Sequence, residues 1–303
     1  MTHLISLFTD NLLPVLLVAG IGFILQRRMR LPARQLSSIV FNVLLPALVF
    51  QLLVTTAIEA ADILRMMGFA LLVMSGVGAV SWGLARALRL SSGSTAALIL
   101  VTMFMNAGNY GLSVSQLAFG EQGLAWATLF YVASSLLTNS LGVYVASVGR
   151  SSPREALTGL LKVPSVYAIP AALVVRLGNL PWPTFIGRPV ELLASAALPL
   201  MLLLLGIQVA DAKLPDARGL LALATGLRLL LSPLIALLLA PLFHLQGSAW
   251  QAGVLEAGMP TAVLTGLIAF QYDLEPDFIT GTILATTVLS PITLTPLIGL
   301  LGG

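Results

Sequence analysis

The sequence predicts an all-α polytopic membrane protein of ten transmembrane helices, arranged as two inverted repeats of five. Of its 303 residues, 58% are hydrophobic and only 9% are charged, whereas a soluble domain carries about 25% charged residues. The apolar runs approach the roughly 20 residues that a helix needs to cross a bilayer, and they lack the alternation of barrel strands. Similar short segments also recur in the two halves of the chain.

Clusters of charge and breaks rich in Pro, Gly or Ser divide the apolar runs into ten predicted spans. The connectors are short, and none is long enough to hold a soluble domain. The predicted domains are therefore the two repeats, residues 1–150 and 151–303. The spans are predicted at 11–26, 38–57, 63–88, 95–118, 123–147, 157–177, 189–210, 219–243, 249–271 and 277–301.

The basic residues predict how the chain is oriented. The first apolar run is followed by Arg27 and Arg28 rather than preceded by basic residues, which indicates a first helix and not a cleaved signal peptide. Loops after odd-numbered spans should be cytoplasmic, because they hold most of the basic residues. We expect a multi-pass protein of the cytoplasmic (inner) membrane, in contact with the lipid bilayer, with both termini outside. The odd-numbered loops contain Arg27, Arg28, Arg30, Arg34, Arg86, Arg89, Arg150, Arg154, Lys162, Lys213 and Arg218, against Arg65, Arg176 and Arg188 opposite.

The internal repeat rests on matches at nearly one offset. Pro46 in "LLPALVFQLL" corresponds to Pro199 in "ALPLMLLLLG", and Phe119 corresponds to Phe270. An odd number of helices in each repeat forces the second copy into inverted topology. The same offset aligns "MNAGNYGLS" (105–113) with "EAGMPTAVL" (256–264), and both strings lie deep in predicted spans four and nine.

Both aligned strings carry residues that disfavour a continuous helix. Pro260 removes a backbone hydrogen bond and clashes with the preceding turn, and glycines at 108, 111 and 258 are poor helix formers. We expect Asn109 to cap a new half-helix and Pro260 to begin one. Paired interrupted spans indicate the binding site of a transporter, although a proline kink with packing glycines explains either break alone. The candidate substrate-binding residues are Asn106, Gly108, Asn109, Tyr110, Gly258, Met259, Pro260 and Thr261.

Other polar residues at depth are weaker candidates. Glu256 is the carboxylate well inside a span, and it is either a proton-coupling residue beside the break or a hydrated residue at the outer end of span nine. Arg228 could meet an anionic substrate or Glu256, but we expect it to snorkel to the cytoplasmic headgroups. Asn42 and Pro46 are further candidates, and Asn42 is expected to bond to a neighbouring helix and to hold the backbone at Pro46. Asn139 lies in a polar seam expected to pack against the broken helices.

Several classes of function find no support in the sequence. The chain contains no cysteine, and its two histidines are solitary, so we expect no metal site and no cofactor. The sequence has no Walker, GxSxG or HExxH motif, and no catalytic dyad, so an intramembrane enzyme or a sensor is a poor alternative. The loops lack the basic and aromatic density of a nucleic-acid-binding protein.

At these residues the chain resembles the auxin efflux carrier family, which includes plant PIN carriers and bacterial malonate- or malate-type carriers. The resemblance covers essentially the whole chain. It implies that broken helices four and nine cross, and that spans 1, 2, 6 and 7 form a scaffold against which the remaining spans move as a transport domain. It also implies a homodimer and an organic anion as substrate. The strings that carry it are "FNVLLPALVF", "NAGNYGLSVSQLAFGEQGLA", "EAGMPTAVLTGLIAFQYD" and "TTVLSPITLTPL".

Two features depart from the family pattern. Bacterial members often have Gly-Leu-Pro where this chain has Gly111-Leu112-Ser113, and the long hydrophilic loop of many plant members is absent. The sequence thus predicts a secondary transporter of a small organic anion, such as an auxin-like carboxylate or a dicarboxylate, by alternating access. The alternative is a sodium- or proton-coupled symporter of the bile-acid-carrier type, which a sodium dependence of binding distinguishes.

Overall fold

The computed structural model describes residues 2–56, 58–147, 163–178, 183–210, 212, 215 and 217–302. These residues are helical apart from connectors and one isolated antiparallel bridge between Met105 and Thr261. The all-helical, multi-pass prediction is confirmed at this level. Four of the basic loop residues, Arg150, Arg154, Lys162 and Lys213, lie outside the described residues. Among the described residues, seven helices are long and apolar enough to cross a membrane: His3–Met29, Ala33–Thr55, Ala60–Ala87, Ala107–Ala146, Thr184–Val209, Arg218–Phe243 and Pro276–Leu301.

The first half of the chain contains helices that overlap the first five predicted spans. Gly120 divides α7 with a φ of 67°, a conformation that glycine adopts at no steric cost, and it lies between predicted spans four and five. The elements are α1 (Thr2–Leu7), η1 (Phe8–Leu12), α2 (Leu13–Met29), α3 (Ala33–Ile39), η2 (Val40–Leu44), α4 (Leu45–Thr55), α5 (Ala60–Ala87), α6 (Ser92–Met103), η3 (Ala107–Leu112), α7 (Ser113–Leu137), η4 (Thr138–Gly142) and α8 (Val143–Ala146).

The second half has helices at each of the other five predicted spans. That these ten segments form two inverted repeats stays a prediction. The elements are α10 (Pro164–Leu177), α11 (Thr184–Val209), α12 (Arg218–Gly226), η5 (Leu227–Leu231), α13 (Ser232–Leu239), η6 (Ala240–Phe243), α14 (Gly247–Ala257), α15 (Leu264–Tyr272) and α16 (Pro276–Leu301).

Helical structure is interrupted between α6 and η3 and again between α14 and α15. The two interrupting segments are hydrogen-bonded to each other, since the amide of Asn106 donates to the carbonyl of Pro260 (2.7 Å) and the amide of Ala262 donates to that of Phe104 (2.9 Å). Thr261 adds a side-chain bond to the carbonyl of Val101 (2.7 Å). Each segment therefore satisfies backbone groups that the other leaves free.

Two expectations about these interruptions are wrong. Asn106, not Asn109, precedes η3, and its side chain makes no capping hydrogen bond. Pro260 does not begin a helix, because α15 starts at Leu264. The chain from Gly258 to Val263 instead stays non-helical while it pairs with the segment after α6.

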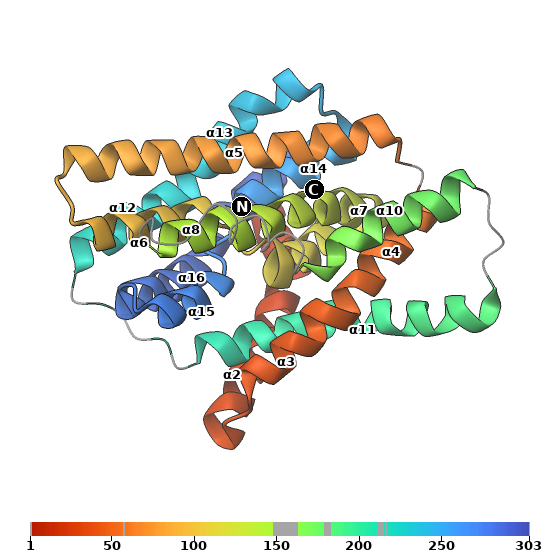
Figure 1. Cartoon of the computed structure of the whole chain (residues 1–303), viewed down its shortest axis with the longest axis horizontal. Coiled ribbons are helices and arrows are strands. Elements are labelled where there is room, and N and C mark those ends of the chain that lie inside the picture. The colour runs from red at the N-terminus through yellow and green to blue at the C-terminus, as the bar shows by residue number, and fades with distance from the viewer. Residues whose placement is uncertain are drawn as a thin grey trace.

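The helices pack in two groups. The α2–α11 group comprises α2, α3, α4, α10 and α11, in which α2 packs on α11 and α4 on α10. The α5–α16 group comprises α5 to α8 and α12 to α16, in which α5 packs on α6 and α14 on α7. In Figure 1, α5 runs along one edge of the molecule with α13 and α14 beside it, and α11 lies with α2 and α3 on the opposite side. Helix η3 contacts both groups, and α7 of the α5–α16 group also contacts α4 and α10 of the other group.

Two glycines bring α2 and α11 into close contact. A Cβ atom on Gly206 would lie 1.7 Å from the carbonyl oxygen of Ala19, and one on Gly22 would lie 2.1 Å from that of Leu203. No side chain fits at either position without moving the opposing backbone. Such small-residue contacts let membrane helices approach closely.

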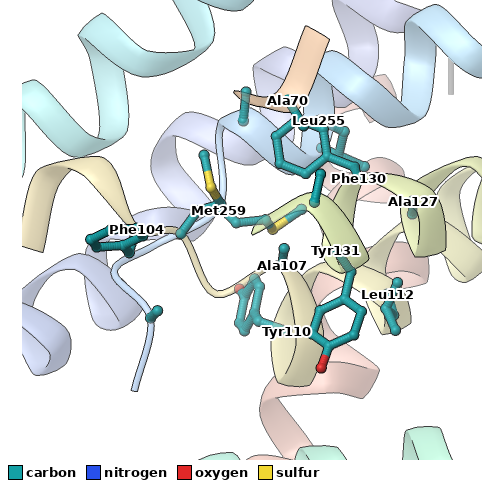
Figure 2. Close-up of a cluster of buried hydrophobic side chains, with 14 of the residues drawn as sticks. Ala70, Phe104, Ala107, Tyr110, Leu112, Ala127, Phe130, Tyr131, Leu255 and Met259 are labelled. Atoms are coloured by element: carbon teal, nitrogen blue, oxygen red, sulfur yellow. The ribbon is translucent and has the colours of Figure 1, made fainter. Parts of the chain in front are cut away.

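A buried apolar cluster fills the space around the interrupted helices. Figure 2 shows Phe104 and Met259, one from each interrupting segment, in the same cluster as Phe130 and Leu255. All four side chains are almost completely buried. The cluster holds the two non-helical segments against α7 and α14.

Candidate functional site

A cavity of about 210 Å³ lies beside the paired segments, and it is the candidate functional site. Five amide side chains line it, from η2, η4, α11 and the stretch 106–109, so we name it the amide cavity. Its size is below the 300–1,000 Å³ of a typical drug-sized site, which fits a small metabolite. The lining residues are Phe41, Asn42, Met105, Asn106, Ala107, Gly108, Asn109, Tyr131, Ser134, Ser135, Thr138, Asn139, Val163, Pro164, Gln208, Ala262, Val263, Leu264 and Leu267.

Asn106 and Asn109 are the most deeply buried amides of the cavity, at 5% and 3% exposed. The side-chain nitrogen of Asn106 and the side-chain oxygen of Asn109 have no hydrogen-bond partner. Buried polar atoms are nearly always paired in folded proteins. Two unpaired amide atoms in the lining of one cavity therefore indicate that a ligand supplies the missing partners.

A chain of hydrogen bonds crosses the cavity wall. The side-chain amide of Asn109 donates to Gln208 (3.2 Å), and the amide of Gln208 donates to the hydroxyl of Ser37 (3.1 Å). Asn109 belongs to η3, whereas Gln208 and Ser37 belong to α11 and α3. The chain therefore links the paired segments to the α2–α11 group.

Another part of the cavity lining is a polar strip at the end of α7 and in η4. Thr138 and Asn139 donate their side-chain protons to carbonyls one turn earlier, at Ser134 and Ser135 (2.8 Å each). Both residues line the cavity. Asn139, expected in a packing seam, thus also faces the site.

Several predicted substrate-binding residues do not line this cavity. The phenol oxygen of Tyr110 accepts a hydrogen bond from Ser290 of α16 (3.1 Å). The backbone amide of Thr261 donates to Thr286 (3.1 Å). In the second interrupting segment the lining residues are Ala262 and Val263, which follow Gly258, Met259, Pro260 and Thr261.

Glu256 is completely buried but lies outside the lining of the amide cavity. One carboxylate oxygen accepts a hydrogen bond from Ser115 (2.9 Å), and the other has no partner. The carboxylate occupies the space beside Gly111, where a Cβ atom would lie 2.1 Å from it. The alternative of a hydrated residue at the outer end of its span is wrong, because no part of Glu256 reaches solvent.

Arg228 is also completely buried, so the expectation that it snorkels to the headgroups is wrong. Its guanidinium donates to the carbonyls of Thr102 (2.5 Å) and Ala257 and to the hydroxyl of Ser232. Among the described residues, no ion pair joins Arg228 to Glu256. Carbonyl groups at helix ends take the place of a carboxylate partner.

Asn42 and Pro46 differ in their relation to the site. Asn42 is exposed to the cavity and donates to the carbonyl of Ser38 (2.8 Å), one turn before it. It does not hold the backbone at Pro46 as expected, because its amide points toward the start of the helix. Pro46 lies in the first turn of α4 and outside the lining.

A second cavity, of about 540 Å³, lies between α2, α4, α7 and α11, and we name it the α2–α7 cavity. It touches Ser113 and Gln116 of α7, and Gln51 and Glu191 from the α2–α11 group. The amide cavity reaches Asn109 and the α2–α7 cavity begins at Ser113. The two cavities therefore contact opposite ends of η3.

Gln208 is the site residue that the sequence analysis missed. It sits near the end of a long apolar helix, where a polar residue is ordinary, and no local pattern marks it. The signal that was available is the predicted topology, which places the end of span seven on the same side of the membrane as the start of span two. Ser37 and Asn42 lie at that start.

The fold is that of a multi-pass membrane protein, and comparison with known families identifies a membrane transport protein. A family model described as "Membrane transport protein" matches residues 7–152 and 150–298. The chain belongs to this family, that of the auxin efflux carriers, and the resemblance drawn from its sequence strings is confirmed.

Individual relatives are similar along almost their whole length. The chain is 29% identical over 297 residues to an "Uncharacterized transporter" of Methanothermobacter thermautotrophicus, which covers 94% of this chain and 96% of the relative. It is 26% identical to the "Uncharacterized transporter YfdV" of Escherichia coli, with 97% of each chain covered. It is 25% identical to a "Putative malonate transporter" of Rhizobium meliloti, which covers 97% of this chain and 95% of the relative.

Proposed function

We propose that this protein is a secondary transporter that binds a small organic anion in the amide cavity and moves it by alternating access. The observation that carries the proposal is the unpartnered side-chain nitrogen of Asn106 in a cavity beside two paired helix interruptions. The unpartnered side-chain oxygen of Asn109 accepts hydrogen bonds, so it would take a proton donor of the ligand, such as a hydroxyl or a protonated carboxyl group. A carboxylate accepts hydrogen bonds from amide donors, and it is the kind of ligand that the free nitrogen of Asn106 requires.

The start of a long helix adds to this preference for an anion. The helical run from Ala107 to Ala146 begins at the cavity. The amino-terminal end of a helix carries partial positive charge and free N–H groups, which stabilise an anion. The lining residues other than the five amides are apolar or hydroxyl-bearing, which suits the carbon skeleton of a small organic acid.

Alternating access is proposed from the two cavities and the two groups of helices. In the proposed arrangement, ten spans form two inverted repeats in which helices four and nine are broken and cross. The α2–α11 group is the scaffold, and the α5–α16 group is the transport domain that moves against it. The two cavities at opposite ends of η3 are then the parts of one pathway that open to opposite sides. We propose that the amide cavity faces the cytoplasm of the inner membrane, with both chain termini outside.

A small carboxylate is the proposed substrate class. One relative carries the name of a malonate transporter, and malonate is small enough to serve as a first probe for a cavity of about 210 Å³. Two copies of the chain are proposed to form a homodimer, as the family resemblance implies. Native mass spectrometry of the purified protein tests that assembly.

Proton coupling is the second part of the proposal, and it rests on Glu256. This carboxylate is buried, has one unpartnered oxygen and forms no ion pair with a described residue. Ionisable residues inside a membrane commonly belong to ion or proton pathways. Glu256 lies against Gly111 of η3, and Gly108 and Asn109 of the same element line the amide cavity, so its proton and the anion would meet the same element.

The test is thermal stabilisation of the purified protein by a panel of mono- and dicarboxylates, in sodium and in potassium, at two pH values. A ligand that binds only the folded protein stabilises it by RT ln(1 + [L]/Kd). Stabilisation by one acid, equal in both salts, supports the organic-anion transporter. Stabilisation that needs sodium would favour the sodium-coupled symporter instead, and stabilisation by none of the acids would contradict the proposed substrate class.

A further inference from the structure

Arg228 holds the carboxyl ends of both interrupted helices. Its guanidinium donates to the carbonyl of Thr102, the next-to-last residue of α6, and to the carbonyl of Ala257, the last residue of α14. Ser232, one turn later on the same helix, adds its own hydroxyl bond to the carbonyl of Ala257 (2.8 Å). One side chain thus joins two segments that are far apart in the sequence.

Both acceptors are groups that need a cation or a donor. The last carbonyls of a helix lack intrahelical partners and form the negative end of its dipole. The chain cannot satisfy Thr102 locally, because the amide of Asn106 is directed to Pro260 instead. Two negative helix ends therefore meet at one place inside the protein, and the positive charge present there belongs to Arg228.

The two segments whose carbonyls Arg228 binds continue into the lining of the amide cavity. Met105 follows Thr102 by three residues, and Ala262 follows Ala257 by five, and both line the cavity. The guanidinium is completely buried and has no described carboxylate partner. A charge of this kind acts over longer distances than it would in water, because the surrounding dielectric is low.

We infer that Arg228 supplies a fixed positive charge to the transport site. Its guanidinium binds the two negative helix ends, which without it would require a cation from solution. This inference rests on the proposed function only for its second consequence, which is that the bound anion needs no sodium. Its first consequence concerns the protein without substrate, namely that the paired helix ends require a positive charge and not only hydrogen-bond donors. Arg228 is therefore a positioning residue for the interrupted helices.

Arginine suits this role because of its shape. Its planar guanidinium presents several N–H donors in a fixed arrangement and stays charged in proteins. It can bridge two carbonyls and a hydroxyl at once, as it does here. Lysine would keep the charge but lose this arrangement, and glutamine would keep two donors but lose the charge.

The experiment separates charge from hydrogen bonding by chemical rescue. The variant Arg228→Ala leaves space for a small planar molecule. Its melting temperature is measured alone and with about 20 mM methylguanidinium or methylurea, which have similar shapes and differ in charge. We expect a lower melting temperature than the wild type, raised by methylguanidinium and unchanged by methylurea. Arg86→Ala, which removes an exposed arginine at the end of α5, is the matched control and should respond to neither compound.

Equal rescue by both compounds, or no rescue by either, overturns the inference. If Arg228→Ala yields no folded protein, the comparison of Arg228→Lys with Arg228→Gln decides: we expect the lysine variant to melt at the higher temperature, and the reverse order overturns the inference.

The sodium arm compares the wild type in sodium chloride and in choline chloride at equal ionic strength. We expect the same melting temperature in both, and the same malonate affinity within twofold if malonate binds. A sodium-dependent melting temperature overturns the inference. A wild type that binds no carboxylate counts against the proposed function alone, because the rescue result still decides the role of the charge.

Discussion

Asn109 donates its side-chain amide to Gln208, which lies 99 positions later in the chain, at a distance of 3.2 Å. Gln208 in turn donates to Ser37. The contact joins η3 to the α2–α11 group and uses one of the two N–H donors of the Asn109 side chain. A carboxylate that takes this N–H must displace Gln208, and the displacement loosens a link between the two groups of helices.

The first prediction is that Gln208→Leu raises the affinity for a bound carboxylate. Leucine keeps the size of the side chain but cannot accept the proton of Asn109, so ligand binding no longer breaks a hydrogen bond. One such bond contributes about 1 kcal/mol, which corresponds to roughly fivefold in Kd. Isothermal titration of the purified variant measures the change.

Gln51→Leu is the matched control for Gln208→Leu. Gln51 lines the α2–α7 cavity and not the amide cavity, so this variant should keep the wild-type affinity. A weaker affinity in Gln208→Leu alone would show that Gln208 contacts the anion directly rather than competing with it.

The second prediction concerns Asn109 itself. Replacement of Asn109 by alanine removes a buried donor from the site and should cost about 1.5–3 kcal/mol of binding free energy, or roughly 10- to 100-fold in Kd. The fold should be retained, because the side chain has a single hydrogen-bond partner. Asn11→Ala serves as the control, since Asn11 is a buried amide outside the cavity lining and donates to the carbonyl of Leu7, one turn before it. Retained affinity in Asn109→Ala would rule out this cavity as the carboxylate site.

The sequence alone predicts the helical class and two of the residues that line the amide cavity. Hydropathy and charge determine where a chain is helical in a membrane, because an unpaired backbone is too costly there. Asn106 and Asn109 were identified because buried amides in an apolar span need partners. Both line the amide cavity.

The glycines were harder to interpret, because one residue type serves two purposes. Gly108 and Gly111 were expected to break their span, but the interruption lies before them and both belong to η3. Each instead makes room for a neighbour: a Cβ atom on Gly108 would lie 3.0 Å from the ring of Tyr131, and one on Gly111 would overlap Glu256. Long-range packing of this kind leaves no local signal. The same holds for Arg228, whose partners come from two other helices.

The third prediction tests the contact between Gly111 and Glu256. In Gly111→Ala the new methyl group would lie 2.1 Å from a carboxylate oxygen, and overpacking of a tight core costs about 1–3 kcal/mol. The variant should melt at a lower temperature than the wild type. Gly83→Ala is the control, because nothing lies within 4 Å of a Cβ atom there, and alanine is the better helix former.

A double variant gives this prediction its sharper form. Residues in contact show non-additive effects on stability. Gly111→Ala combined with Glu256→Ala should therefore lose less stability than the sum of the two single variants, because the alanine at 256 leaves space for the methyl group. Additive losses would mean that the two residues are not in contact.

The fourth prediction concerns proton coupling through Glu256. Glutamine keeps the size of the side chain and an acceptor for Ser115 but cannot exchange a proton. In proteoliposomes, we expect Glu256→Gln to lose the stimulation of carboxylate uptake by a proton gradient while it retains substrate exchange at equal pH. Glu59→Gln, at an exposed position before α5 and outside both cavities, should retain both. If Glu256→Gln still responds to the gradient, the proton is carried elsewhere.

The fifth prediction uses the absence of cysteine from the sequence. A single introduced cysteine is then the sole target of a membrane-impermeant thiol reagent. Asn42 lines the amide cavity and Gln51 lines the α2–α7 cavity, and both lie on the helix that runs from Ala33 to Thr55. Asn42→Cys should react from the cytoplasmic side and Gln51→Cys from the opposite side. Ser290→Cys, at a completely buried position, should react slowly from both.

Alternating access adds a condition that a fixed pore does not meet. If the two cavities open in turn, a bound substrate that favours one state must change the two labelling rates in opposite directions, because it shifts a single equilibrium between states. A ligand that slows Asn42→Cys and speeds Gln51→Cys, or the reverse, fits this mechanism. Labelling of both variants from one side would refute the orientation proposed from the basic loops, and parallel changes in the two rates would refute the two-state movement.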